Sequence, residues 1–138
     1  MRDSELNWQA IRAPGLDRFE AMARAAFAAL PDEFRALCGD VVVLVEDFPD
    51  EDVMRTMKLE SEFDILGLYT GVALPFQESF AAPRLPNTVH LYRRPILDYW
   101  AEHDEALGDI ITHVLVHEIG HHFGFSDDDM HGIEDTGD

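Results

Sequence analysis

The sequence predicts an α+β fold, in which a small mixed β-sheet is packed by helices and the longest helix lies near the C-terminus. Apolar residues recur at spacings of three and four in residues 16–30 and again in residues 110–119, the pattern of helices with one buried side. Two short runs rich in β-branched residues, 41–45 and 88–92, predict strands between these helices.

Two helices are expected at the start of the chain. Pro14 precedes the first, whose apolar stripe consists of Leu16, Phe19, Ala23, Phe27 and Leu30. The second begins at Pro31 and ends at Gly39. Its apolar residues are expected to point inward, and they are Phe34 and Leu37. Cys38, near its end, is interpreted as a small packed residue, because nothing in the sequence indicates an activated thiol.

The middle of the chain predicts strands separated by polar segments. The run 41–45 is continuously apolar, which is typical of a strand buried on both faces. Residues 50–60 are expected to form a short helix or a packed loop. Residues 50–52 are all acidic, and negative charge is favourable at the start of a helix because of the helix dipole. Residues 65–74 are strand-like, with Gly67 and Gly71 marking a bulge or a close backbone approach.

The second half of the chain leads to the long helix. Residues 75–87 contain several turn-forming residues and predict a surface loop, followed by the strand 88–92. Residues 96–100 start a helical turn. The long helix then runs from about residue 104 or 109 to residue 123. Its buried side is expected to consist of Ile110, Ile111, Val114, Leu115 and Ile119.

The composition restricts the classes of protein to which the chain can belong. A length of 138 residues suits one domain over residues 1–138, with loose ends at residues 1–13 and 134–138. Twenty-eight acidic and 10 basic residues give a net charge of −18, which repels nucleic acids and anionic membranes and attracts cations. The single cysteine and the absence of a signal peptide or an apolar run of membrane-spanning length predict a cytoplasmic protein.

The long helix carries a pattern with specific chemistry. His117 and His121 are four residues apart, so they share one helix face and can bind the same metal ion. Glu118 lies about 100° around the helix from His117, beside that metal, where a carboxylate can take a proton from metal-activated water. This is the H-E-x-x-H arrangement of zinc hydrolases.

A third metal ligand is expected just after the helix. Gly124 allows a left-handed turn at the helix end, so that the chain can double back and direct Asp127 at the same ion. Asp128, Asp129 and His131 are nearby alternatives. From the composition, H-E-x-x-H occurs by chance with a probability of roughly 0.03, and the pattern that includes Gly124 and Asp127 with about 0.0005. We therefore prefer a metal site to a surface helix that happens to carry two histidines.

The predicted reaction is the hydrolysis of a peptide bond with one catalytic zinc ion and Glu118 as general base. His122 points away from the metal and is expected to be packed or hydrogen-bonded rather than a ligand, and no partner is visible for His90. The oxyanion stabiliser is left open among Tyr69, Tyr92, Tyr99, Arg93 and His131. An extended peptide could add as a strand to residues 89–92 or 71–74.

Three blocks together resemble the small bacterial metallopeptidase family with a minimal zincin-like domain. They are residues 66–75 (LGLYTGVALP), 89–95 (VHLYRRP) and 116–131 (VHEIGHHFGFSDDDMH). The resemblance implies a zincin-like fold and a zinc peptidase with His117, His121 and Asp127 as ligands and Glu118 as base. Met130 could underlie the site as the methionine turn does in metzincins.

Three other classes of protein remain as alternatives. A metal-dependent endoribonuclease family has a similar histidine pattern, but here Glu118 replaces its glycine and Asp127 replaces its last histidine. The net charge of −18 is also poor for binding RNA. Two histidines and a carboxylate could hold Fe(II) in an oxygenase, where Glu118 would have no obvious role. A non-catalytic, acidic or metal-binding interaction protein explains the charge but not the motif. The expected partner is a peptide or protein substrate, with no nucleic acid and no membrane, and the oligomeric state is left open.

Overall fold

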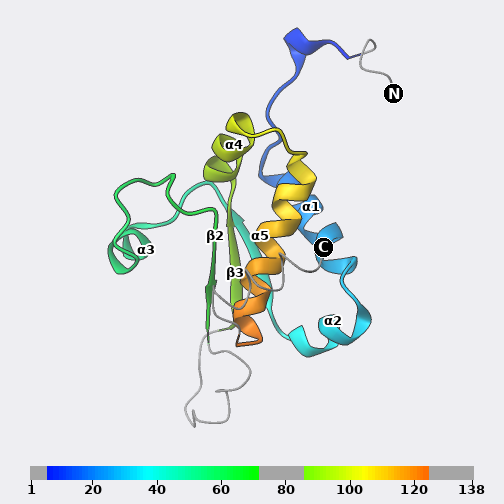
Figure 1. The fold of residues 1–138 in the computed structure, drawn as a ribbon, viewed down its shortest axis with the longest axis vertical. Helices are drawn as coiled ribbons and strands as arrows, with labels where there is room; N and C mark the ends of the chain where they lie inside the picture. The colour runs from blue at the N-terminus through cyan, green and yellow to red at the C-terminus, as the bar shows by residue number, and fades with distance from the viewer. Residues whose placement is uncertain (1–5, 72–85, 125–138) are drawn as a thin grey trace.

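The computed structural model describes residues 6–71 and 86–124. Within these ranges, helices surround a three-stranded mixed sheet, so the predicted α+β fold is confirmed (Figure 1). No helix in these two ranges is long and apolar enough to cross a membrane. Residues 134–138, which were expected to be loose, lie outside the described residues.

The two N-terminal helices begin and end close to the predicted positions. Helix α1 (Leu16–Ala28) follows Pro14-Gly15 and buries Phe19 and Ala23. Helix α2 (Asp32–Cys38) ends at Gly39, whose positive φ of 42° favours glycine, and it buries Cys38.

The prediction that the apolar residues of α2 point inward is wrong. Phe34 is 42% exposed and Leu37 is 55% exposed. Helix α2 is only seven residues long and buries none of its residues except Cys38. Phe34 instead lies against the ring of Phe123 beyond the end of the long helix, with 5.8 Å between ring centroids.

The sheet has the order β1-β3-β2. Strand β3 (Thr88–Tyr92) lies in the centre, parallel to β1 (Val42–Glu46) and antiparallel to β2 (Gly67–Thr70). The inward residues of β3 are Val89 and Leu91, and both are fully buried in the core. The central strand is therefore paired on both sides, and β2 is an edge.

Strand β1 is not buried on both faces as predicted. Val45 is 7% exposed and contributes to the core, whereas Val42 and Leu44 are 44% and 41% exposed. Helix α1 packs against β1, and Val45 joins the core to which α1 contributes, whereas the side chains of Val42 and Leu44 point to the opposite face of the strand. A continuous apolar run does not distinguish this arrangement from a strand covered on both faces.

The remaining helices follow the strands closely. Helix α3 (Glu51–Thr56) is capped by Asp50, whose carboxylate accepts a hydrogen bond of 2.8 Å from the Val53 amide. Helix α4 (Arg93–Glu102) begins directly after β3, earlier than the predicted residue 96. Pro95 does not prevent this start, because an amide in the first helical turn has no intrahelical acceptor to lose.

Helix α5 (Leu107–His122) is the long helix predicted from the apolar periodicity. It packs on α1 and on the sheet, and it crosses the sheet beside β2 and β3 (Figure 1). All five predicted apolar residues are buried, and they are Ile110, Ile111, Val114, Leu115 and Ile119. This burial fixes α5 against the core, and α5 contacts the edge strand β2.

Candidate metal centre

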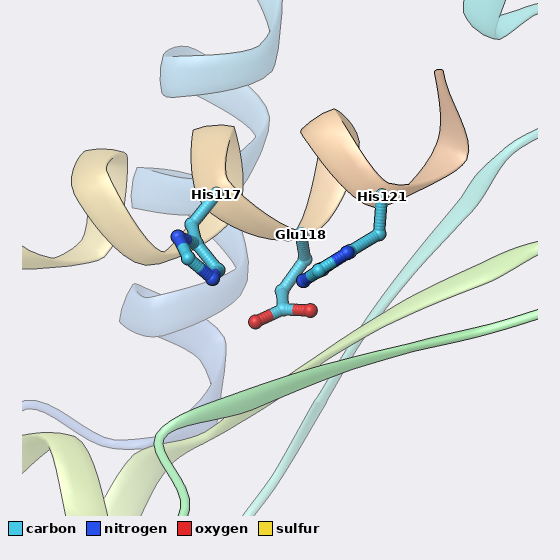
Figure 2. Close-up of side chains that lie close together, drawn as sticks. All are labelled: His117, Glu118 and His121. Carbon is cyan, nitrogen blue, oxygen red and sulfur yellow. The ribbon is translucent and has the colours of Figure 1, made fainter. Parts of the chain in front are cut away.

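The last turns of α5 bring three possible ligands together. One ligand atom from each of His117, Glu118 and His121 lies within 4.8 Å of the other two. Figure 2 shows all three side chains projecting from α5 toward the strands, with the Glu118 carboxylate between the two imidazoles. The imidazole rings of His117 and His121 are 5.2 Å apart and nearly perpendicular. The helical spacing thus places the three residues as the sequence predicted.

The cluster lies in a cleft between α5 and the edge strand. The cleft has a volume of about 470 Å³ and is lined by Met57, Ile65, Gly67, Leu68, Tyr69 and the three cluster residues. Glu118 is 8% exposed, whereas His117 and His121 are half-buried. The Glu118 carboxylate thus forms part of the cleft wall, and the two imidazoles lie nearer to solvent.

Gly67 is what allows β2 to approach α5 so closely. A Cβ atom on this residue would lie 2.6 Å from Val114 Cγ1 and 3.0 Å from the His90 carbonyl oxygen. It would also lie 3.4 Å from Cγ of Glu118. The close backbone approach predicted at Gly67 is therefore confirmed, and it forms one wall of the cleft.

A second contact joins β2 to α5 one turn further along the helix. The Nδ1 atom of His122 and the hydroxyl of Tyr69 are 2.8 Å apart, within hydrogen-bonding distance. His122 is 1% exposed, and burial lowers the pKa of its imidazole, whereas a hydrogen bond with the Leu37 backbone and the charge of Asp40 act in the opposite direction. His122 is thus packed and hydrogen-bonded, as expected from the sequence.

The donor set fits a zinc ion. Two imidazoles within reach of one point, with a carboxylate beside them, are the nitrogen and oxygen ligands that zinc uses in catalytic sites. The predicted third ligand, Asp127, lies outside the described residues. So do its alternatives Asp128, Asp129 and His131, and Met130.

The oxyanion candidates differ in their positions. Tyr69 lines the cleft. Tyr92 is 1% exposed, and its pKa is raised by burial and by the charges of Glu46, Asp50 and Glu118, so its hydroxyl stays protonated. Arg93 binds the Asp47 carboxylate and the Pro14 carbonyl.

The two remaining oxyanion candidates, Tyr99 and His131, are not found in the cleft of the described structure. Tyr99 donates a hydrogen bond to Glu105 away from the metal cleft, and His131 lies outside the described residues. Tyr69 is thus the one candidate of the five that lines the cleft in the described part of the chain.

The structure tests only one of the two segments predicted to bind a peptide by strand addition. Residues 89–92 belong to the central strand β3, which is paired on both sides, so the prediction for this segment is wrong. Most of the other segment, residues 72–74, lies outside the described residues. The neighbouring strand β2 is an edge strand of the described sheet, and its residues Gly67, Leu68 and Tyr69 line the cleft.

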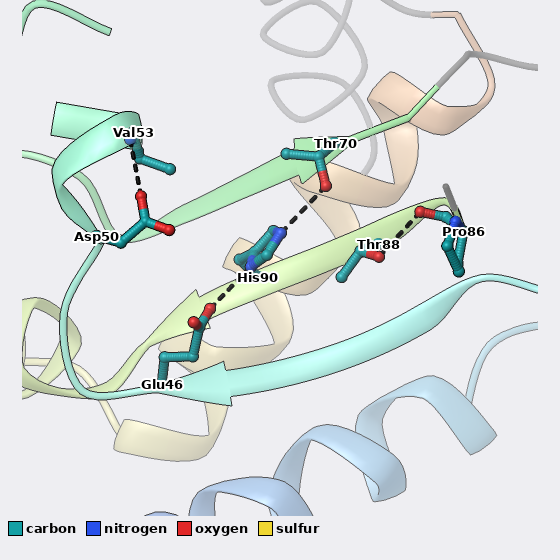
Figure 3. A network of polar contacts seen from close by, with 7 residues as sticks. All are labelled: Glu46, Asp50, Val53, Thr70, Pro86, Thr88 and His90. Atoms are coloured by element: carbon teal, nitrogen blue, oxygen red, sulfur yellow. Dashed lines mark hydrogen bonds and ion pairs between the residues drawn. The ribbon is translucent and has the colours of Figure 1, made fainter. Parts of the chain in front are cut away.

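His90 has partners that the sequence did not reveal. Its Nδ1 atom lies 2.8 Å from a carboxylate oxygen of Glu46, and its Nε2 atom lies 3.1 Å from the Thr70 hydroxyl (Figure 3). The three residues come from three different strands. Only the register between the strands could have predicted this network, because the nearest of its pairs is 20 residues apart in sequence.

Comparison with known proteins agrees with this geometry. A family model described as zincin-like metallopeptidase matches residues 38–136, which is more than half of the chain. The matched segment extends from the end of α2 through the sheet and α5. No curated protein matches the chain.

Proposed function

Because the chain belongs to the zincin-like metallopeptidase family, we propose that it is a zinc-dependent peptidase that hydrolyses peptide bonds. The observation that carries this proposal is the cluster of His117, Glu118 and His121 in a cleft beside β2, an edge strand of the described sheet. We propose His117, His121 and Asp127 as the ligands of one zinc ion. Such an ion supplies Lewis-acid chemistry: it polarises a carbonyl group and lowers the pKa of water toward 7.

Glu118 is the general base and then the general acid. Its buried carboxylate takes a proton from the attacking water as the new C–O bond forms. The same carboxyl group returns this proton to the amide nitrogen as the C–N bond breaks. Glu118 thus ends the cycle in the protonation state in which it began.

We propose that the substrate is a peptide or a protein segment in extended conformation. An extended peptide can add as a further strand beside an edge strand, and β2 is an edge strand of the described sheet. Its residues Gly67, Leu68 and Tyr69 line the cleft that contains the cluster. The net charge of −18 opposes binding of nucleic acid. This argues against an endoribonuclease despite the similar histidine pattern.

The proposed activity is tested by removing the base while keeping the metal ligands. Wild-type protein and the Glu118→Gln variant are compared for zinc content and for cleavage of a mixed peptide library. We expect one zinc ion per chain in both and at least a 100-fold loss of cleavage in the variant, a typical effect of losing a general base. Glu102→Gln, an exposed residue at the end of α4, serves as control and should cleave normally. Equal cleavage by wild type and Glu118→Gln would contradict the proposal.

The third ligand is tested separately. Asp127→Ala should weaken zinc binding strongly, because a carboxylate ligand is lost from a three-residue site. Tight retention of zinc would shift the assignment to His131 or Asp128. A wild-type protein that binds iron instead of zinc would favour an oxygenase, and one without any metal would favour a non-catalytic protein.

A further inference from the structure

A second pocket lies beside the metal cleft, at the start of α5. Its volume is about 290 Å³. Helix α4 packs on α5 at this end, and the pocket is enclosed by both helices, by the loop that joins them and by the residue that precedes β2 (Figure 1). The residues that line it are Leu66, Tyr99, Glu105, Ile110, His113 and Val114.

The pocket and the metal cleft are neighbours along the same helix and the same strand. His113 lines the pocket and His117 lines the cleft, and their rings are stacked with 6.5 Å between centroids. A Cβ atom on Gly67 would approach both Val114, which lines the pocket, and Glu118, which lines the cleft. One turn of α5 therefore separates the pocket from the metal cluster, about 6 Å along the helix axis.

This separation suits one side chain of a bound peptide. An extended chain advances about 3.3 Å per residue, and its successive side chains point in opposite directions. A peptide with its scissile bond at the metal cluster therefore brings one side chain to the pocket, from a residue no more than two positions from that bond. The pocket is thus placed to discriminate between substrates.

The pocket combines an apolar floor with a charged mouth. Ile110 and Val114 are 3% and 6% exposed, and Leu66 is half-buried. Glu105 is exposed, so its carboxylate lies at the mouth. A side chain that fills this pocket needs an apolar stem and a cationic end. Arginine and lysine have this form, because their methylene stems pack on apolar surface while the charged group stays near water.

The carboxylate of Glu105 is held by the end of α4. The Tyr99 hydroxyl donates a hydrogen bond of 3.2 Å to it. The Tyr99 ring is itself stacked on His103, with 3.8 Å between centroids, and Nδ1 of His103 donates a hydrogen bond of 2.7 Å to the Tyr99 carbonyl oxygen. A carboxylate has about four lone-pair positions, and the bond from Tyr99 uses one. The others can accept the paired N–H groups of a guanidinium.

From this arrangement we infer that the pocket is a substrate subsite for an arginine or lysine side chain, and that Glu105 determines this selectivity. Tyr99 is the residue that positions the carboxylate. The inference rests on the proposed peptidase function, because it concerns the peptide that is bound at the metal cluster. The net charge of −18 attracts basic peptides in general, whereas Glu105 selects the basic residue at one position.

Peptides that differ at one position test the inference. A mixed peptide library treated with zinc-loaded wild type should show enrichment of Arg and Lys at one position, no more than two residues from the cleaved bond. Arg is then compared at that position with citrulline, which has the shape of Arg without its charge. We expect kcat/KM to be about fivefold higher for the Arg peptide, a modest factor because Glu105 is exposed.

Variants of the pocket assign the preference to its residues. Glu105→Gln should lower the ratio of the two kcat/KM values to about one and leave cleavage of the citrulline peptide unchanged. Glu105→Arg should reverse the preference, so that a peptide with Glu at this position is cleaved faster than the Arg peptide. Tyr99→Phe keeps the carboxylate but loses the bond that holds it, so the ratio should fall to about two. Glu102→Gln removes an equal charge from an exposed residue outside the pocket and should keep the wild-type ratio.

Binding can be measured without turnover in zinc-loaded Glu118→Gln. By fluorescence anisotropy, its affinity for the Arg peptide should exceed that for the citrulline peptide by about fivefold, and adding Glu105→Gln should abolish the difference. An Arg placed five residues further from the cleaved bond lies beyond the pocket. Any preference for Arg over citrulline at that distant position should be the same with and without Glu105→Gln.

Equal cleavage of the Arg and citrulline peptides by wild type would overturn the inference. So would an equal loss of preference in Glu105→Gln and Glu102→Gln, because it would show a general effect of net charge. If wild type cleaves peptides, Glu118→Gln does not, and no basic residue is preferred, then only the role of the pocket is wrong. If wild type with bound zinc cleaves no peptide, the proposed function and this inference are both wrong.

Discussion

At the scale of single residues, Gly67 shows how the absence of a side chain shapes the cleft. Its Cα hydrogen faces Val114 and Glu118 at a distance that a methyl group could not occupy. The edge strand can therefore lie directly against the turn of α5 that carries the base. The cleft wall is formed by backbone at this point, which suits the binding of an extended peptide.

We predict that Gly67→Ala lowers the free energy of unfolding by about 1–3 kcal/mol, the usual effect of overpacking a rigid contact. Its Cβ would lie 2.6 Å from Val114 Cγ1 and 3.0 Å from a backbone oxygen, so either the strand or the helix must shift. Urea unfolding measures the change. Gly108→Ala is the control, since its Cβ would meet only Met22 Cε at 3.8 Å and stability should stay equal or rise by up to about 1 kcal/mol. Equal stability of the two variants would contradict the prediction.

The residues of the candidate site differ in how far the sequence could predict them. His117, Glu118 and His121 lie within five residues on one helix, so helical geometry alone places them together. The contact between Tyr69 and His122 joins residues 53 positions apart. It depends on how β2 packs against α5, and no local pattern encodes that packing.

At the scale of the elements, the helices and strands were predictable but their neighbours were not. Apolar periodicity indicates that a segment has a buried side. The prediction of α5 and of its buried residues is correct because it depends only on this periodicity. The periodicity does not indicate which strand lies at an edge. The order β1-β3-β2 places the most apolar strand, β1, at an edge, where Val42 and Leu44 are exposed.

The network around His90 joins all three strands, and we predict that it stabilises the sheet. His90→Phe keeps an aromatic ring beside Tyr92 but loses both hydrogen bonds, to Glu46 and to Thr70. The free energy of unfolding should fall by about 1 kcal/mol, a modest value because Glu46 is 37% exposed.

Chemical denaturation measures the free energy of unfolding of this variant, with Val42→Thr as the control. Val42 is exposed on the same face of the sheet, so its replacement should change the free energy of unfolding by no more than about 0.5 kcal/mol. If His90→Phe unfolds at the same denaturant concentration as wild type, the network contributes nothing to stability.

At the scale of the whole molecule, the excess of negative charge opposes folding. Four arginines of the described residues pair with carboxylates, and these are Arg24, Arg35, Arg55 and Arg93. With 28 acidic and 10 basic residues, such pairs cannot balance the charge. Folding brings the unpaired carboxylates closer together, so their repulsion is stronger in the compact state than in the extended chain.

We therefore predict that salt stabilises the protein. Raising NaCl from 10 to 200 mM shortens the Debye length from about 30 Å to less than 10 Å and should raise the Tm by roughly 3–8 °C, most of it below 100 mM. A variant with Glu60→Lys and Glu62→Lys, both exposed, has a charge of −18 + 4 = −14 and should show a higher Tm at low salt and a smaller rise. A Tm that rises steadily with salt and equally in both proteins would indicate a general effect of salt on hydrophobic burial instead. A Tm independent of salt would show that the repulsion has no weight in folding, and the acidic surface would then need another explanation, such as the attraction of cations to the cleft.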